Sequence, residues 1–318
     1  MIISTAIFAM SLSALAITCA MATVYAQPAA AQTATNLTCN GCVNSQDIKD
    51  RGIQAKDLAP GLAFGKTILV RANGVTPGAN CSKLRNALAN IDDAAPNNPV
   101  LIKLERGTYN CGASPLAMKR FVAIEGAGRS ATRIFGNVNS PDQGVIKGAN
   151  DASLHHLTVQ HGASGSAAVA ISTGGSRMRL SDVAVKVDSA TASVVGILAN
   201  GGSLDLSSVS IQTTADAAQG QGIRGESGAK LNMMNIWVHN SASAGNPAAL
   251  MLFDSSATGY GVLFSSNFFA LLGFGNSVFE LVDGTLIGGR GAAGGFTGSF
   301  TCVGIAHGDF TARAVDCS

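Results

Sequence analysis

The sequence predicts an all-β fold, a single-stranded parallel β-helix in which one chain winds through successive coils of short strands. The prediction rests on an internal repeat after residue 150 and on an unusual composition. Glycine accounts for 38 of the 318 residues, whereas charged residues make up 13%, well below the usual ~25%. This composition favours many tight turns between short strands, and the 47% hydrophobic share suffices for a large core.

The repeat consists of four aligned eight-residue segments, which recur along the chain at a nearly constant spacing. They occupy positions 152–159, 178–185, 204–211 and 231–238. The segments share four apolar columns: Ala152, Met178, Leu204, Leu231; Leu154, Leu180, Leu206, Met233; Leu157, Val183, Val209, Ile236; and Val159, Val185, Ile211, Val238. Apolar and polar residues alternate along each segment, but the alternation skips one place between the second and third columns. The skip predicts a bend between two short strands.

A third strand per coil is predicted between these segments. Four apolar residues recur there with the same spacing, namely Ile171, Ile197, Ile223 and Leu250. Turn sequences such as Thr-Gly-Gly-Ser at residues 173–176 follow them. The repeats contain no long amphipathic stretch, so helical and leucine-rich solenoids are disfavoured.

The segment 100–136 resembles a known family. Ile102 to Tyr109 reads I-x-L-x-x-G-x-Y, Val122 to Gly128 reads V-x-I-x-G-x-G, and Thr-Arg-Ile follows at 132–134. This order is similar to the first coils of pectin-lyase-like β-helix proteins, including uncharacterised secreted bacterial members. The resemblance covers roughly residues 66 to 318 and implies a right-handed solenoid, while it is weak for activity.

Caps are expected at both ends, because a solenoid exposes apolar cross-sections there. Residues 82–91 have apolar side chains at helical spacing and predict a short N-terminal capping helix. Residues 300–305 and 309–315 predict a C-terminal hairpin. Residues 251–295 are apolar but irregular, so coils are placed there only loosely. The predicted organisation is 1–26 signal peptide, 27–65 linker or docking segment, 66–115 cap and first strand, 116–295 β-helix and 296–318 disulfide-closed hairpin.

The N-terminus predicts export to the cell surface or the extracellular space, with the periplasm as a further destination. The first 46 residues carry no charged side chain, and an apolar stretch precedes the small residues around Ala26. A signal peptide normally begins with Lys or Arg, and none occurs here, so a retained membrane anchor stays open as the alternative. After signal removal no membrane span is expected.

Six cysteines remain after the signal peptide, an even number that favours disulfides in an oxidising compartment. Proximity along the chain favours three pairs, Cys302 with Cys317, Cys81 with Cys111, and Cys39 with Cys42, although sequence cannot fix the connectivity. A redox or zinc role for the Cys39–Cys42 pair is disfavoured, because no βαβ pattern and no second ligand pair follow. No metal site and no cofactor is predicted.

The resemblance implies lyases, hydrolases and esterases of acidic polysaccharides among the proteins with this fold, yet their residue sets are missing here. No cluster of acids suggests a calcium cage, and no aspartate series fits a galacturonan hydrolase or a pectin methylesterase. His156 and Asp182 fall on one column at the bend and are the weak catalytic candidates for acid-base work. A solvated turn contact is the plainer interpretation.

Residues between the inward columns point outward and predict a ligand-binding face. One outward column consists of Gln160, Lys186, Gln212 and His239, and Trp237 stands beside it. Sugars stack on exposed aromatic rings while hydrogen-bonding to polar neighbours. A tryptophan covered by a loop or a partner chain is the alternative.

The predicted function is therefore a secreted β-helix without recognisable catalytic residues that binds polysaccharide along its outer strand faces. A polysaccharide lyase, hydrolase or esterase is the first alternative, and a fibre or adhesin component, with homo-oligomerisation, is the second. Nucleic acid is excluded as a partner, because a net charge of +2 with scattered Lys and Arg offers no basic stripe.

Overall fold

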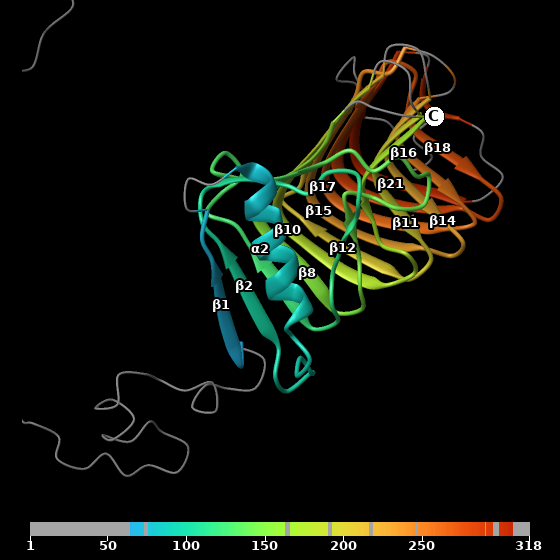
Figure 1. The fold of residues 1–318 in the computed structure, drawn as a ribbon. Coiled ribbons are helices and arrows are strands. Elements are labelled where there is room, and N and C mark those ends of the chain that lie inside the picture. Colours follow the sequence, from blue (N-terminus) through green and yellow to red (C-terminus); the bar gives the residue numbers. More distant parts are fainter. Residues whose placement is uncertain are drawn as a thin grey trace, which may run out of the picture. The chain divides into compact units, whose positions relative to one another are not determined.

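The computed structural model shows a right-handed parallel β-helix, as the sequence predicts (Figure 1). It describes residues 64–72, 76–162, 166–189, 193–215, 219–243, 245, 247–289, 291–294 and 299–307. Each coil contributes strands to two parallel sheets, and each strand pairs with the equivalent strand of the next coil. The chain therefore advances along the solenoid axis by one strand spacing, ~4.8 Å, per coil.

The larger sheet carries the strands that contain the predicted bend. Its members are β1 (Lys66–Val70), β2 (Val100–Leu104), β3 (Gly107–Asn110), β5 (Val122–Glu125), β6 (Thr132–Gly136), β8 (Ala152–His161), β10 (Arg177–Ser189), β12 (Ser203–Ser207), β13 (Ser210–Ala215), β15 (Lys230–Asn240), β17 (Ser256–Ser266), β19 (Val278–Gly288) and β21 (Ser299–His307). The second sheet holds the third strand of each coil. Its members are β4 (Leu116–Ala117), β7 (Ile146–Lys147), β9 (Ala167–Ser172), β11 (Ser193–Asn200), β14 (Gly220–Glu226), β16 (Ala248–Phe253), β18 (Phe269–Phe274) and β20 (Gly291–Gly294).

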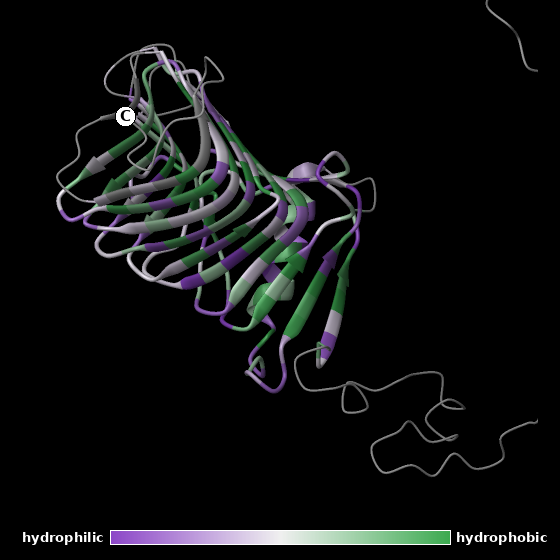
Figure 2. Cartoon of the chain, turned by 180° about the vertical axis from the view of Figure 1, so that it is seen from behind, coloured by the Kyte–Doolittle hydropathy of each residue, from purple (hydrophilic) through white to green (hydrophobic). Residues whose placement is uncertain are grey.

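The strand register confirms the predicted columns. Leu204 pairs with Met178 on one side and with Leu231 on the other. In the second sheet, Ile197 pairs likewise with Ile171 and Ile223. These inward side chains are buried and stack into one continuous core inside the coils, and Figure 2 shows hydrophobic segments on successive strands.

The predicted bend is a single residue with left-handed backbone conformation. His156, Asp182, Ser208 and Asn235 have φ of 52°, 53°, 54° and 55° in four successive coils. Such a conformation turns the strand sharply, and it costs ~1–3 kcal/mol unless the surroundings stabilise it. We call the strand segments before this residue the first arm and those after it the second arm. The two arms present separate outer faces.

The N-terminal cap is the predicted helix, α2 (Pro77–Ala89), which begins earlier than the apolar spacing suggested. Pro77 occupies the first helical position, where its missing N–H costs nothing, and the Thr76 side chain accepts a hydrogen bond from the Ala79 N–H. Cys81 of α2 forms a disulfide with Cys111, which confirms that pairing.

A buried tyrosine closes the first coil. The Tyr109 hydroxyl is 3.1 Å from both the Val70 and the Glu105 carbonyl oxygens, to which it can donate. Its burial raises the pKa of the phenol to about 12, and the charge of Glu105 acts in the same direction. The phenol is therefore neutral and able to donate at any ordinary pH.

Coils beyond residue 250 are regular but shorter, which explains why the sequence pattern lost its period there. Val278 pairs with Ser256, and Ser299 pairs with Val278, so each of these coils is several residues shorter than those before them. Cys302 lies on β21, where its backbone pairs with that of Leu281. The predicted signal peptide, the linker, Cys39, Cys42, Cys317 and the second strand of the predicted hairpin lie outside the described residues.

Candidate functional site

The outer face of the second arm holds the predicted binding residues. We call it the polar face; it comprises Arg133, Gln160, Lys186, Gln212, Trp237 and His239. Lys186 pairs with Gln160 and Gln212, and Gln212 pairs with His239, so the column runs without a gap through four coils. At one strand spacing per coil, it extends over ~14 Å.

A pocket of about 320 Å³ opens at the N-terminal end of the polar face. Arg129, Arg133 and Lys186 contribute to its wall, and none of its lining residues is an Asp or Glu. The complete lining is Gly107, Thr108, Arg129, Ser130, Ala131, Arg133, Thr158, Gln160 and Lys186. Arg133 and Lys186 form no ion pair with any described residue and create a positive potential that favours an anionic ligand, whereas Arg129 is paired with Asp182.

The surroundings fix the Arg133 side chain. Its guanidinium donates to Gln160 Oε1 at 3.2 Å and to Thr108 Oγ1 at 3.3 Å, and it lies 5.9 Å from the centre of the Phe135 ring. All these partners are uncharged. The positive charge of Arg133 is therefore held in position without being neutralised.

Trp237 stands at the other end of the polar face. Its side chain is 40% exposed, so the described residues do not cover it. The indole stacks against the His239 imidazole of the same strand, with ring centroids 6.0 Å apart and ring planes 6° from parallel. Stacking restricts both rings and leaves an aromatic surface beside the polar column.

His156 and Asp182 come together at the bend, where Asp182 also forms an ion pair with Arg129. His156 Nδ1 lies 2.8 Å from Asp182 Oδ2, and Arg129 Nε lies 2.6 Å from the other carboxylate oxygen. Arg129 also donates to the Ser208 carbonyl, far away in the sequence. The hydrogen bond from His156 and, in addition, the charge of Arg129 lower the pKa of Asp182 below its usual value.

Asp182 is thus a charged acceptor that holds Arg129 along the bend, next to the cationic pocket. Among the described residues, no hydroxyl group forms a hydrogen bond with the His156–Asp182 pair, and no second carboxylate forms an ion pair with His156. A positioning role for the pair explains the geometry, and its catalytic role stays a prediction. Arg129 is not predictable from the sequence, because nothing in the local pattern shows that its side chain reaches Asp182 and Ser208.

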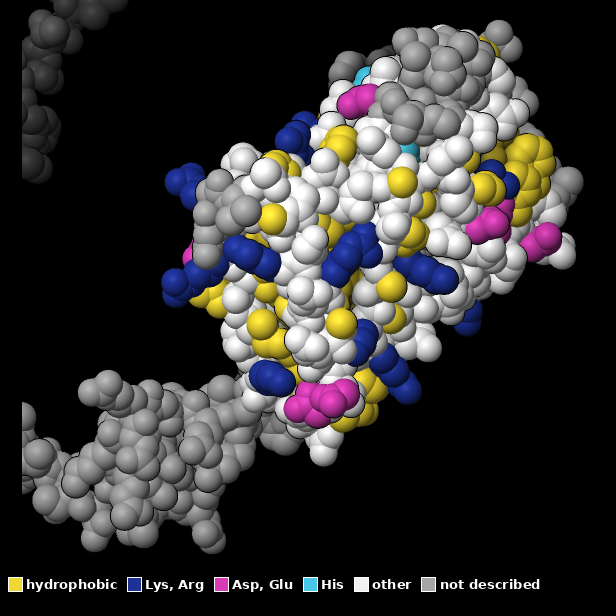
Figure 3. Space-filling view, viewed as in Figure 1, with side chains coloured by type: hydrophobic (Ala, Val, Ile, Leu, Met, Phe, Trp, Pro, Cys, Tyr) yellow, Lys and Arg dark blue, Asp and Glu magenta, His cyan; other side chains and the backbone are white. Residues whose placement is uncertain are grey.

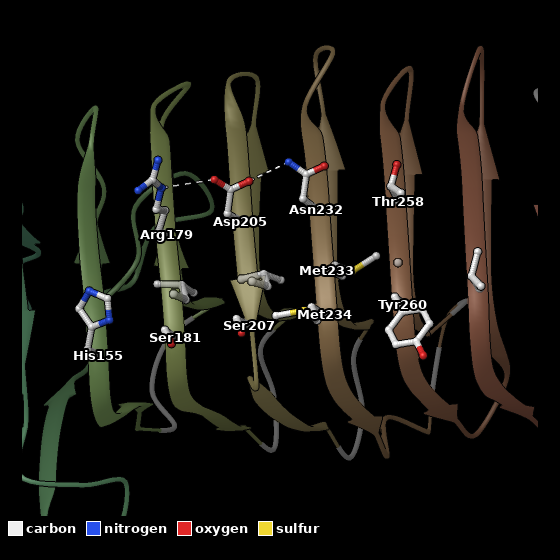
Figure 4. Close-up of a pocket in the computed structure, with 14 residues that line it drawn as sticks. His155, Arg179, Ser181, Asp205, Ser207, Asn232, Met233, Met234, Thr258 and Tyr260 are labelled. Atoms are coloured by element: carbon white, nitrogen blue, oxygen red, sulfur yellow. Dashed lines mark hydrogen bonds and ion pairs between the residues drawn. The ribbon is translucent and has the colours of Figure 1, made fainter. Parts of the chain in front are cut away.

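A second concave surface lies on the first arm and has a volume of about 490 Å³ (Figure 4). Figure 4 shows its outward-pointing side chains in two rows that cross successive strands, with Leu180, Leu206, Met233 and Gly259 between the rows. The upper row contains Arg179, Asp205, Asn232 and Thr258; the lower row contains His155, Ser181, Ser207, Met234, Tyr260 and Val282. None of these residues is among the ligand-binding candidates that the sequence predicts.

Asp205 interacts with both of its neighbours in the upper row. Asp205 accepts a hydrogen bond of 2.7 Å from the Asn232 amide and lies 3.5 Å from Arg179 Nε. The charges of Arg179 and Asp205 cancel, so this groove lacks the positive potential of the pocket on the polar face. The two surfaces therefore suit different partners.

The part of the chain that the structure describes shows neither a cluster of metal ligands nor a membrane-spanning helix. No group of three His, Cys, Asp or Glu side chains among these residues is arranged to hold a metal ion. None of the described helices is both long and apolar enough to cross a bilayer.

Comparison with known proteins finds distant similarity in fold alone. No protein-family model matches the chain. No curated protein matches it either. Among solved structures, the pectin methylesterase PemA from Erwinia chrysanthemi is similar with a TM-score of 0.49 and 12% identity, over 80% of this chain and 92% of that one. A mannuronan C-5 epimerase A-module from Azotobacter vinelandii is similar with a TM-score of 0.29 and 11% identity, over 72% of this chain and 92% of the module. At such identities the likeness concerns the β-helix and not the activity.

Proposed function

We propose that this protein is a secreted, non-catalytic β-helix that binds an anionic polysaccharide along the polar face. The observation that carries the proposal is the pocket whose lining includes Arg133 and Lys186, which form no ion pair with any described residue, and includes no Asp or Glu. It continues along a polar column toward an exposed, stacked tryptophan. A linear chain of acidic sugars has the matching chemistry, with repeated carboxylates, hydroxyl groups and apolar ring faces.

Each residue of the polar face has a role in this proposal. Arg133 and Lys186 form charge-assisted hydrogen bonds with sugar carboxylates, and these are about twice as strong as neutral ones. Gln160 and Gln212 lie in the coils on either side of Lys186 and exchange hydrogen bonds with sugar hydroxyl groups. Trp237 stacks on the apolar face of a sugar ring.

Export is part of the proposal and rests on independent features. The disulfide between Cys81 and Cys111 fits an oxidising compartment. The apolar N-terminal stretch fits a signal peptide ending at Ala26. An extracellular or cell-surface protein would meet acidic polysaccharides directly.

The experiment is a titration of the purified protein with polygalacturonate and alginate oligosaccharides, with neutral dextran as the reference glycan. We expect saturable binding to an acidic glycan that weakens at high salt, because exposed charge pairs are screened. Lys186→Ala and Trp237→Ala should each weaken binding ~10-fold or more, the equivalent of losing about 1.4 kcal/mol. Lys147→Ala is the matched control, since Lys147 is an exposed cation on the second sheet.

Two results would contradict the proposal. Binding that is equal for acidic and neutral glycans would remove the role of the cationic pocket. Equal loss in the Lys147 and Lys186 variants would show only non-specific charge attraction. Product formation in the same samples is monitored as well, and turnover abolished by His156→Gln would instead favour an enzyme that uses the His156–Asp182 pair.

A further inference from the structure

The lower row of the first-arm groove changes in side-chain size between Ser181 and Val282, whereas His155, one coil before Ser181, is large. Ser181 and Ser207 are small and lie in the earlier coils, while Tyr260 and Val282 are large and lie in the later ones (Figure 4). Met234 stands between the two pairs. Met234 and Tyr260 are 50% and 55% exposed, although their side chains are largely apolar. A contiguous exposed patch of this kind marks an interaction surface.

In the upper row, the sign of the charge also changes along the solenoid axis. Arg179 lies two coils before Asn232, and Glu280 lies two coils after it. Glu280 is exposed and forms no salt bridge with any described residue. The segment 231–289 contains no Lys or Arg at all, whereas both recur throughout 64–230. Lys and Arg side chains are accordingly visible over the N-terminal part of the described surface (Figure 3).

We infer that this face binds a second copy of the chain in a symmetric dimer. The two-fold axis runs parallel to the strands, between the two copies, at the coil that contains Asn232 and Met234. Rotation about this axis turns one first-arm face onto the other and reverses the order of the coils. Each row then faces the same row of the second copy, read in the opposite direction.

This rotation matches large side chains with small ones. Tyr260 lies opposite Ser207 of the second copy, and Val282 lies opposite Ser181. Packed sheets are ~10 Å apart, so side chains from the two faces have to interdigitate rather than meet end to end. Met234 faces its own equivalent, where an unbranched and flexible side chain adapts easily.

The same rotation places Arg179 opposite Glu280 of the second copy. Arg179 is already close to Asp205 within its own chain, and in the dimer it lies between two carboxylates. Glu280 thereby gains a cation, with which no described residue of its own chain provides it. The same two-fold axis thus matches large side chains with small ones and Arg179 with Glu280. This double match favours a second copy of the chain over an unrelated apolar partner.

Sedimentation velocity of the native chain tests the inference. We expect a dimer that forms in a concentration-dependent manner. Ser207→Arg should abolish it, because the arginine side chain would fill the space that Tyr260 of the second copy occupies in the dimer. Ser210→Arg is the matched control: Ser210 lies on the same coil but beyond the bend, and this variant should dimerise like the native chain. A native chain that remains monomeric up to its solubility limit, or equal dimerisation in both variants, overturns the inference.

A cross-linking experiment checks the orientation. Arg179→Lys allows zero-length carbodiimide coupling to carboxylates in direct contact. Positions 179 and 280 are separated by four coils within one chain, ~19 Å, so a link between them can form only between two copies. We expect this link in mixed isotope-labelled and unlabelled protein; coupling to Asp205 alone overturns the proposed arrangement. Ser207→Arg should keep native glycan affinity, which separates this test from the function proposed for the polar face.

Discussion

The disulfide of the N-terminal cap allows a quantitative prediction. Cys81 on α2 and Cys111 after β3 close a loop with a sequence separation of 30 residues. In the chain-entropy treatment, a loop of this length destabilises the unfolded state by about 3.6 kcal/mol at 25 °C. Breaking the bond should therefore lower the free energy of unfolding of the cap by about that amount.

Amide hydrogen exchange is the suitable assay, because the coils of a solenoid contact mainly their neighbours and unfold in local units. In the double variant Cys81→Ala/Cys111→Ala, amides of α2 should exchange between two and three orders of magnitude faster, since about 1.4 kcal/mol corresponds to each tenfold change. Reduction of the native protein is the control that keeps both sulfur atoms. Amides of β14, several coils away, should keep their native rates.

Unchanged exchange in α2 after removal of the bond would refute the loop-closure reasoning. Equal acceleration in α2 and β14 would refute the second part, namely that the cap opens on its own. A change limited to the double variant and absent on reduction would assign the effect to lost packing of Cys81, which is 1% exposed.

Three further predictions follow from single side chains, and denaturant titration checks each of them. Gly222→Ala should destabilise the protein by ~1–3 kcal/mol, because the added Cβ would lie 2.1 Å from Val238 Cγ1. Gly78→Ala is the control and should not lower the stability, because nothing lies within 4 Å of a Cβ at Gly78. Burial lowers the pKa of His155 below 6.5, so on acidification the imidazole is protonated in the unfolded chain before it is protonated in the folded one. Stability should therefore decrease as the pH falls below 6.5, and His155→Gln should weaken that pH dependence. The pKa of Asp182 is lowered from 3.8, chiefly by the hydrogen bond from His156, so its contribution is complete above pH 3.8 and disappears as the pH falls through the folded-state pKa. Asp182→Asn should therefore be less stable than the native chain at neutral pH and equally stable in strong acid; a constant difference at all pH values would contradict this.

The repeat made the register of the coils predictable. The columns through Leu204 and Ile197 could be read directly, because burial of one strand face imposes a period of two along each strand and coils of equal length impose a constant offset between strands. Where the coils shorten, as at β19 and β21, one strand face is still buried, but the sequence spacing between coils is no longer constant and the register cannot be read from it.

The candidate site was only partly accessible to sequence reasoning. The column from Gln160 to His239 follows from the register alone, and so does the contact between His156 and Asp182 in neighbouring coils. Arg129 does not follow, since a long side chain can extend in several directions and only packing selects one.

The sequence by itself thus determined the coil and its inward columns, because these depend on periodic burial, and it favoured the Cys81–Cys111 pairing through short chain separation. Only the tertiary structure decided how sharply the strands bend, which outward residues surround a concave surface and which charges are neutralised. Those properties depend on side chains that are adjacent across coils, as with Arg179 and Asp205 or Tyr260 and Met234, and their combined shape and potential exist only once the coils have stacked.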